Sequence, residues 1–221
     1  MKRVSAIIVA AGEGRRFGSL KQFSLLRGKP VLEWCLESFE VHELVDEIVL
    51  VLPQVTEQEK FFSLYKKIVA VVEGGKKRQD SVLKGFAELR PEKTGIVLVH
   101  DGVRPLVEKD LISRVIEETL KRGAAIPALQ IEETVKEVQE GEVIRTVNRA
   151  ALYRIQTPQG FSYALLKEAL ERATKENFYG TDEAMLVERI GRKVFVVEGD
   201  PLNIKITTAA DIKTMEALFE S

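Results

Sequence analysis

The residues with the clearest chemical potential follow the first apolar run of the sequence. Residues 4–9 (VSAIIV) lead into AAGEGRRFG at positions 10–18, and Lys21 comes three residues later. A buried strand that ends in glycines presents backbone N–H groups, and the nearby cations add positive charge. Because this combination binds phosphate groups, we expect a nucleotide site at the start of the chain.

The spacing of the glycines narrows the type of nucleotide site. A dinucleotide fingerprint requires a glycine where the sequence has Phe17, and a Walker A loop requires one where it has Phe17 or Ser19. What remains is AAGxGxRFG followed by a lysine, which resembles the signature of nucleotidyltransferases that make sugar and alditol nucleotides. A glycine-rich turn with solvated arginines is the plainer interpretation.

Further candidates come directly after later apolar runs. In an open α/β sheet, ligands bind beyond the carboxyl ends of the strands. The segment EGGKKRQDS at 73–81 has two glycines that allow close backbone approach, and it places Ser81 in the first turn of the next helix. This segment can hold a base, a ribose or a phosphate. The alternative is an ordinary turn with Asp80 or Ser81 as a helix N-cap.

A carboxylate and a guanidinium follow the run at 95–100. Asp101 could hold Mg²⁺ or a ribose hydroxyl, and Arg104 suits bidentate contact with a phosphate. An internal ion pair is the alternative. We expect His100 to be structural, because no Cys or second His accompanies it.

The last candidates lie in the C-terminal half. Thr157 follows another strand, and Thr181 or Asp182 is expected to cap a helix. Lys205 lies within an apolar Ile-Lys-Ile run, so it needs an anionic partner or must reach solvent. A phosphate would supply that partner.

Composition limits the functional class. The chain has 221 residues and a formal net charge of −1, so no global field indicates nucleic acid or an anionic membrane as a partner. Cys35 is the only cysteine and lies on an apolar face, which predicts a core residue in a reducing cytoplasm. No apolar run approaches the length of a membrane span. We expect a cytoplasmic protein.

These residues must be positioned by alternating strands and helices, which indicates an α/β fold. We expect one domain over 1–221, with a Rossmann-like, mostly parallel sheet and helices on both faces. The strands are expected at 4–9, 46–52, 68–72, 95–100, 124–130, 151–156 and 193–198. The helices are expected near 31–40, 56–67, 80–90, 108–122, 162–174, 182–190 and 209–219.

One segment interrupts the alternation. Two short β-rich runs between 133 and 148 flank a turn that contains Gly141, which predicts a protruding β-hairpin arm over about 131–149. An isolated two-stranded ribbon is marginal in water. We therefore expect the arm to pack on a second copy of the chain, the alternative being an arm folded back on its own domain.

Taken together, the motifs resemble one family over essentially the whole chain. That family is the 2-C-methyl-D-erythritol 4-phosphate cytidylyltransferases, which have the fold of nucleotide-diphospho-sugar transferases. The motifs that carry the resemblance occur in order as AAGEGRRFG with Lys21, GGKKRQDSV, HDGVRP, ETVK, Asn148-Arg149, QTPQGF, GTDEA and NIKIT.

The resemblance implies an enzyme that transfers CMP from CTP to 2-C-methyl-D-erythritol 4-phosphate, with Mg²⁺ as cofactor and a homodimer that shares its active sites through the arm. The implied catalytic residues are Arg16, Lys21, Arg149 and Lys205. The implied nucleotide-binding residues are Ala10, Ala11, Gly12, Gly14, Gly75, Ser81, Asp101 and Gly102. The implied acceptor-binding residues are Arg104, Thr134 and Thr157, and Asp101 is the implied metal ligand.

Two departures and three alternatives belong to this interpretation. Lys76 and Leu202 stand where some relatives carry aspartate, so a second protein ligand for Mg²⁺ is not implied. The alternatives are a cytidylyltransferase for another alditol phosphate such as ribitol 5-phosphate, a uridylyl- or guanylyltransferase for a sugar 1-phosphate, and a non-catalytic nucleotide-binding module.

Overall fold

A central sheet organises the computed structural model, which describes residues 2–14, 17–54 and 64–218. Within these residues the main sheet has eight strands, in the order β10-β7-β11-β6-β1-β4-β5, and β12 pairs with β7. Its strands are β1 (Arg3–Val9), β4 (Glu47–Leu52), β5 (Ile68–Glu73), β6 (Thr94–Asp101), β7 (Ala124–Gln130), β10 (Tyr153–Ile155), β11 (Gln159–Ser162) and β12 (Phe195–Glu198).

Parallel pairing dominates this sheet. Strand β1 pairs in parallel with β4 and with β6, β4 pairs in parallel with β5, and β12 pairs in parallel with β7. Only β10 and β11 run antiparallel to their neighbours. The expected α/β class with a mostly parallel sheet is confirmed.

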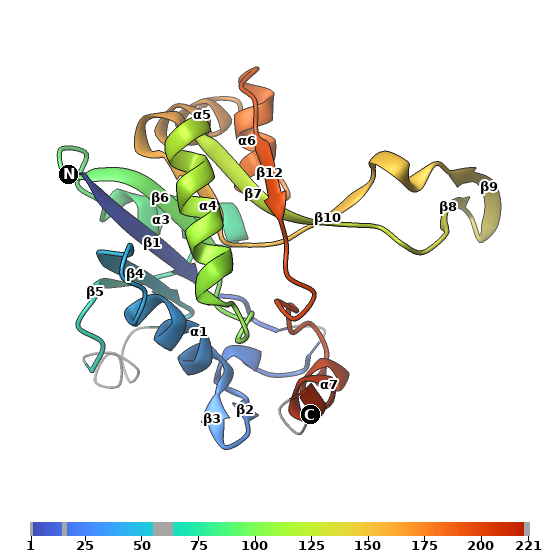
Figure 1. The fold of residues 1–221 in the computed structure, drawn as a ribbon, viewed down its shortest axis with the longest axis horizontal. Helices are drawn as coiled ribbons and strands as arrows, with labels where there is room; N and C mark the ends of the chain where they lie inside the picture. Colours follow the sequence, from blue (N-terminus) through green and yellow to red (C-terminus); the bar gives the residue numbers. More distant parts are fainter. Residues whose placement is uncertain (1, 15–16, 55–63, 219–221) are drawn as a thin grey trace.

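Helices cover both faces because the strands alternate their apolar side chains between two cores. Along β1, Ala6 and Ile8 enter the core under α1 (Val31–Glu40) and α4 (Lys109–Arg122), while Ile7 and Val9 enter the opposite core. The second core is closed by α3 (Arg78–Ala87), α5 (Tyr163–Lys175) and α6 (Glu183–Arg189). Figure 1 shows α4 lying across one face of the sheet.

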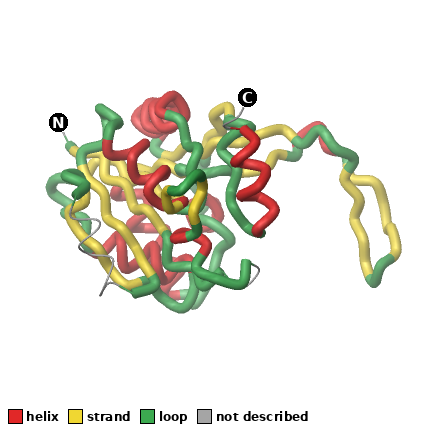
Figure 2. The backbone as a smooth tube through the Cα atoms, turned by 90° about the horizontal axis from the view of Figure 1, so that it is seen from below, coloured by secondary structure: helices red, strands yellow, loops and turns green. Residues whose placement is uncertain are grey.

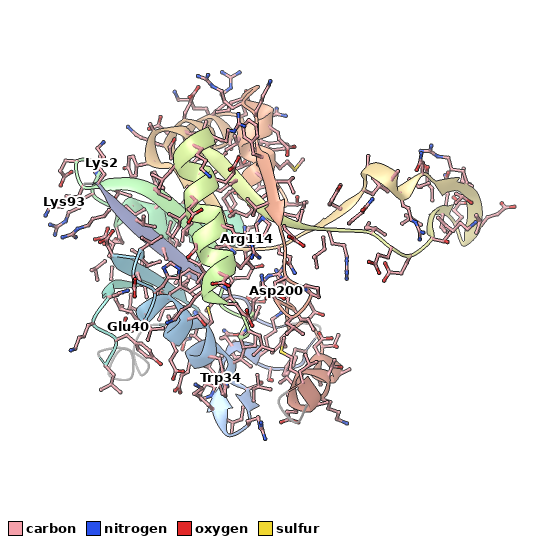
Figure 3. The ribbon with its side chains drawn as sticks, viewed as in Figure 1. Lys2, Trp34, Glu40, Lys93, Arg114 and Asp200 are labelled. Atoms are coloured by element: carbon pink, nitrogen blue, oxygen red, sulfur yellow. The ribbon has the colours of Figure 1, made fainter. Side chains whose placement is uncertain are left out.

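A smaller cluster lies below the carboxyl ends of the strands. Helix α7 (Ala209–Leu218) buries Met215 there against Leu26 of the short hairpin β2 (Leu25–Leu26) and β3 (Lys29–Pro30). Trp34 of α1 packs against the same cluster, and its Nε1 donates a 3.0 Å hydrogen bond to the carbonyl oxygen of Leu26 (Figure 3). No helix in the described ranges is both long and apolar enough to cross a bilayer.

The hairpin arm is present and extends away from the sheet. Strands β8 (Val135–Gln139) and β9 (Glu142–Val147) pair only with each other among the described strands. Their turn is Glu140-Gly141, and both residues have positive φ, as a tight hairpin turn requires. Figures 1 and 2 show the ribbon projecting beyond the body of the protein. The arm is therefore not folded back on its own domain.

Three local features differ from the expectations or lie partly outside the described residues. Strand β11 was not expected, because a four-residue buried strand that contains Gly160 has no alternating pattern to reveal it. The helix expected near 56–67 lies largely outside the described residues, and residues 64–67 form turns, not a helix. The strand expected over 151–156 is shorter, because residues 149–151 form the 3₁₀ turn η2 (Arg149–Ala151).

Candidate active site

A cavity of about 360 Å³ opens at the carboxyl ends of β1, β5 and β6. This is the edge at which a doubly wound sheet binds its ligands. Its wall brings together segments that are far apart in the sequence. The lining residues are Val9, Ala10, Ala11, Gly12, Glu13, Lys21, Gln22, Gly75, Lys76, Lys77, Arg78, Ser81, Asp101, Val103 and Lys205.

The glycine-rich loop after β1 forms one side of this cavity. Gly14 has φ +65°, and a Cβ there would lie 1.9 Å from the carbonyl oxygen of Ser19, so only glycine fits. At Gly12, no atom of the described residues lies within 4 Å of the position of a Cβ. Gly14 is not among the lining residues, and Arg16 lies outside the described residues.

The second glycine turn packs directly on the first. A Cβ on Gly74 would lie 2.2 Å from Cβ of Ala11, and a Cβ on Gly75 would lie 2.2 Å from Cβ of Asp80. The backbone N–H of Gly75 donates a 3.0 Å hydrogen bond to Oγ of Ser81. The expected close backbone approach is thus present. The helix N-cap is Lys77, not Asp80 or Ser81, and its N–H donates to Oδ2 of Asp80 at 3.0 Å.

Lys21 joins the first loop to the segment that carries Lys205. It begins the short 3₁₀ helix η1 (Lys21–Phe23), and its Nζ donates to the carbonyl oxygen of Ile206 at 2.7 Å. The segment at 203–207 is irregular backbone, anchored where the N–H of Ile206 donates to the carbonyl oxygen of Val103. Two expected phosphate-binding cations therefore lie on segments that touch.

Asp101 is the electrostatic centre of the site. Its Oδ1 accepts from Nε of Arg78 at 2.9 Å, its Oδ2 accepts from Nζ of Lys205 at 2.7 Å, and Nε of Arg104 lies 3.9 Å from Oδ2. Burial raises the pKa of this carboxyl, but the three cations outweigh that effect and hold the pKa well below its usual range. Asp101 is therefore ionised at every physiological pH.

A second, smaller cavity of about 280 Å³ lies on the other side of Asp101. Arg78, Asp101 and Lys205 line both cavities, so they form a wall between them. The remaining lining residues of the smaller cavity are Arg104, Ile155, Gln156, Thr157, Gln159, Thr181 and Asp182. Most of the expected residues thus line one or both of these neighbouring cavities.

Arg104 and Thr157, which line the smaller cavity, are held in place by hydrogen bonds to other residues of the protein. Nη1 of Arg104 donates to the carbonyl oxygen of Asn203 at 2.6 Å, whereas its buried Nε has no hydrogen-bond partner. Oγ1 of Thr157 accepts from the N–H of Asp101 at 3.1 Å and lies 3.0 Å from Nδ1 of His100. A buried guanidinium with an unpaired N–H is suited to an incoming anion.

The structural expectations for three other residues hold. His100 is fully buried, and burial lowers its pKa to about 3, so it is neutral. Cys35 is buried in the core beneath α1. Asp182 is the N-cap of α6, where its Oδ1 accepts from the N–H of Met185 at 3.0 Å.

Gly102 and the arm residues do not line either cavity. A Cβ on Gly102 would lie 3.0 Å from Cβ of Ala10, so this glycine lets β6 approach the first loop. Thr134 and Arg149 are exposed near the base of the arm, and neither lines the cavities. Within this chain, the structure does not bring them to the other expected site residues.

The described residues do not fit a metal centre held by the protein. They contain no group of three His, Cys, Asp or Glu side chains placed to hold an ion. Asp101 is the expected ligand, but both its oxygens are engaged by Arg78 and Lys205.

The sequence analysis missed Arg78 and Glu183. Nη1 of Arg78 contacts Oε1 and Oε2 of Glu183 at 2.8 Å, and Glu183 is only 1% exposed. A signal was available, because Lys76, Lys77 and Arg78 crowd the start of a helix, where the helix dipole disfavours cations. Such a cluster needs anions nearby, either from the protein or from a ligand.

Comparisons with known proteins cover the whole chain. Residues 4–221 match the family model described as 2-C-methyl-D-erythritol 4-phosphate cytidylyltransferase. The chain is 42% identical over 223 residues to the protein of that name from Geobacillus thermodenitrificans, covering 98% of this chain and 96% of the relative. It is 41% identical over 231 residues to the one from Geotalea uraniireducens, covering 99% and 97%.

Solved structures agree with the sequence comparisons. The 4-diphosphocytidyl-2C-methyl-D-erythritol synthase from Anaerococcus prevotii matches with a TM-score of 0.88 at 35% identity, covering 100% of this chain and 97% of that one. The 2-C-methyl-D-erythritol 4-phosphate cytidylyltransferase from Thermus thermophilus matches with a TM-score of 0.83 at 36% identity, covering all of both chains.

Proposed function

The chain belongs to the 2-C-methyl-D-erythritol 4-phosphate cytidylyltransferase family, and from this premise we propose how its residues carry out the reaction. The enzyme transfers CMP from CTP to 2-C-methyl-D-erythritol 4-phosphate in isoprenoid precursor synthesis, which yields 4-diphosphocytidyl-2-C-methyl-D-erythritol and pyrophosphate. The observation that supports our assignment of residues is the wall of Arg78, Asp101 and Lys205 between two adjacent cavities.

We assign the larger cavity to CTP. The backbone of Ala10, Ala11, Gly12 and Gly14 would surround the triphosphate, as glycine-rich loops surround phosphates. Gly75, Ser81, Asp101 and Gly102 would contact or shape the cytidine part of the site. Lys21 lies in this cavity, and Arg16 would supply the second cation.

We assign the smaller cavity to the acceptor. Arg104 and Lys205 would bind its phosphate, and Thr157 would contact the polyol. The unpaired Nε of buried Arg104 supports this assignment, because a phosphate oxygen would satisfy it. Asp101 is then a counter-ion that neutralises these cations before the acceptor binds.

The reaction follows from the charges. A phosphate oxygen of the acceptor attacks the α-phosphorus of CTP, a new P–O bond forms, and the bond to the bridging oxygen breaks as pyrophosphate leaves with the electron pair. A phosphomonoester is already anionic at neutral pH, so the nucleophile needs no strong general base. The work of the protein is to hold two anions together and to stabilise the developing charge. We assign this role to Lys21, Lys205 and Arg16.

A divalent cation, Mg²⁺ in our proposal, accompanies the triphosphate. Mg²⁺ usually retains several waters and binds through one or two carboxylates together with substrate phosphates. Because Asp101 is already paired with Arg78 and Lys205, the cation in our proposal is held mainly by the triphosphate.

We further propose a cytoplasmic homodimer of single-domain chains (1–221), joined through the arm at about 131–149. Val138, Val143 and Ile144 expose more than half of their surface on this ribbon. Apolar side chains on an isolated ribbon favour burial against a partner. Thr134 and Arg149 would then reach the acceptor in the other subunit.

Pyrophosphate release tests the function. Purified protein with CTP and Mg²⁺ is expected to release pyrophosphate with 2-C-methyl-D-erythritol 4-phosphate and much less with D-ribitol 5-phosphate. UTP and GTP in place of CTP serve as controls for the base. Preference for ribitol phosphate would retain the chemistry and refute the acceptor. No acceptor-dependent release would refute the enzymatic role.

A further inference from the structure

Arg78 connects two buried carboxylates that lie far apart in the sequence. Its Nε donates to Asp101 at 2.9 Å and its Nη1 donates to both oxygens of Glu183 at 2.8 Å. Burial lowers the pKa of Arg78, but the two carboxylates outweigh that effect and raise the pKa overall. The guanidinium is therefore a fixed charge held at two sites.

The start of α3, which carries Arg78, is also held to the segment before α6 by the residues on either side of Arg78. The next residue, Gln79, donates from Nε2 to the carbonyl oxygen of Phe178 and accepts from the N–H of Gly180, both at 3.0 Å. Nζ of Lys77 lies 3.4 Å from the centroid of the Tyr179 ring. Consecutive residues at the start of α3 thus fasten it to the segment before α6. Replacing the Arg78 side chain leaves these contacts in place.

The three cations around Asp101 differ in what else holds them. Arg78 is held by Glu183, and Arg104 is held by the carbonyl oxygen of Asn203. The only hydrogen bond recorded for Nζ of Lys205 within the described residues is the one to Asp101. Lys205 is therefore the cation that can turn most easily from Asp101 to an incoming phosphate.

We propose that Arg78 is a positioning residue: clamped by Glu183, it keeps Asp101 fixed in the wall between the two cavities and thereby releases Lys205 to the acceptor phosphate. This inference rests on the proposed assignment of Lys205 to the acceptor. Without Arg78, Asp101 would keep Lys205 as its main counter-ion and compete with the acceptor for it. A lysine at position 78 cannot replace the clamp, because its compact ammonium lacks the fork that reaches both carboxylates.

The test is a set of variants with a surface control. Arg78→Met removes the clamp, Arg78→Lys keeps the charge, and Glu183→Gln removes the anchor. Arg172→Met is the control, because Arg172 is an exposed arginine that pairs with Glu176 on the surface of α5. Steady-state kinetics with CTP and 2-C-methyl-D-erythritol 4-phosphate, together with thermal unfolding, are measured for each variant and for Arg78→Met combined with Glu183→Gln.

The proposed role of Arg78 predicts specific changes in the KM and kcat values of the variants. Arg78→Met should raise the acceptor KM by about tenfold or more and should lower kcat. The rise in the acceptor KM should be larger than the rise in the CTP KM. Such a loss is on the scale of one charge-assisted hydrogen bond. Glu183→Gln should act in the same direction but less strongly, and Arg78→Lys should fall between Arg78→Met and the wild type. Because Glu183 acts through Arg78, adding Glu183→Gln to Arg78→Met should cost little more.

Three results would overturn the inference. The first is that folded Arg78→Met has the kinetic constants of the wild type. The second is that Arg78→Lys is fully active. The third is that Glu183→Gln changes the kinetic constants as much in the Arg78→Met background as in the wild type. If Arg78→Met does not fold, Arg78→Lys and Glu183→Gln decide by their acceptor KM. An inactive wild type would refute the proposed function instead, whereas an active wild type with unaffected variants would refute this inference alone.

Discussion

Nζ of Lys21 donates a 2.7 Å hydrogen bond to the carbonyl oxygen of Ile206, the residue that follows Lys205. This contact joins the first glycine-rich loop to the segment 203–207, although 185 positions separate the two residues. The cation proposed for the triphosphate and the cation proposed for the acceptor are thereby set on adjoining pieces of backbone. Four predictions follow from this arrangement and its surroundings.

Lys21→Ala should lower kcat by roughly two decades, the scale of losing one preorganised donor to the transition state. The measurement is pyrophosphate release at saturating substrates. Lys167→Ala is the matched control, because Lys167 is an exposed lysine paired with Glu171 on α5. An unchanged kcat in Lys21→Ala would exclude its catalytic role.

Gly74→Ala and Gly12→Ala should separate folding from nucleotide binding. The methyl group on residue 74 would meet Cβ of Ala11 at 2.2 Å, so we expect a loss of about 1–3 kcal/mol in the free energy of unfolding. The methyl group on residue 12 meets no atom of the described part of the chain within 4 Å and would occupy the proposed phosphate site. Gly12→Ala should therefore raise the CTP KM and leave the melting temperature nearly unchanged. The opposite ranking of the two melting temperatures would contradict the packing argument.

Stability should fall as the pH drops below about 6.5, because burial lowers the pKa of His100 to about 3. The unfolded chain takes up a proton on this residue near pH 6.5 and the folded chain does not, so acid favours unfolding. Between pH 6.5 and 4.5 this histidine contributes a slope of up to about 1.4 kcal/mol per pH unit.

Denaturant unfolding of His100→Gln over that range should show a smaller loss of stability with acid. His42→Gln is the comparison, because burial also lowers the pKa of His42, whose Nε2 lies within hydrogen-bond distance of the carbonyl oxygen of Lys109 and Oγ of Ser113 on α4. An acid slope equal to that of the wild type in His100→Gln would show that His100 titrates normally in the folded protein.

Shared active sites predict complementation between inactive subunits. When Lys205→Ala and Arg149→Ala chains are co-expressed, each mixed dimer should contain one site with both defects and one intact site. Random pairing then gives about a quarter of wild-type activity, although each variant alone is nearly inactive. Lys205→Ala mixed with Lys21→Ala is the control and should show no recovery, because both residues belong to the same subunit's site. Equal recovery in both mixtures, or in neither, would contradict an arm that serves its partner.

Local sequence patterns predicted most of the strands and helices and both glycine turns. A continuous apolar run marks the buried strand β1, and an apolar repeat near every 3.6 residues marks the helix α4. The glycines of the two turns also stand out in the sequence, and the structure shows that Gly14, Gly74 and Gly75 leave no room for a Cβ. A short buried strand such as β11 escaped prediction, because its pairing depends on neighbours and not on its own pattern.

Only the tertiary structure decided what Asp101 faces. Arg78 reaches Asp101 across 23 positions and Glu183 across 105, and Lys205 reaches Asp101 across 104. No local pattern encodes such distances, since they depend on the order of strands in the sheet and on where each loop crosses its edge. The sequence therefore predicted cations that need anionic partners. The fold determined that a buried carboxylate of the protein, Asp101, holds three of these cations between two cavities.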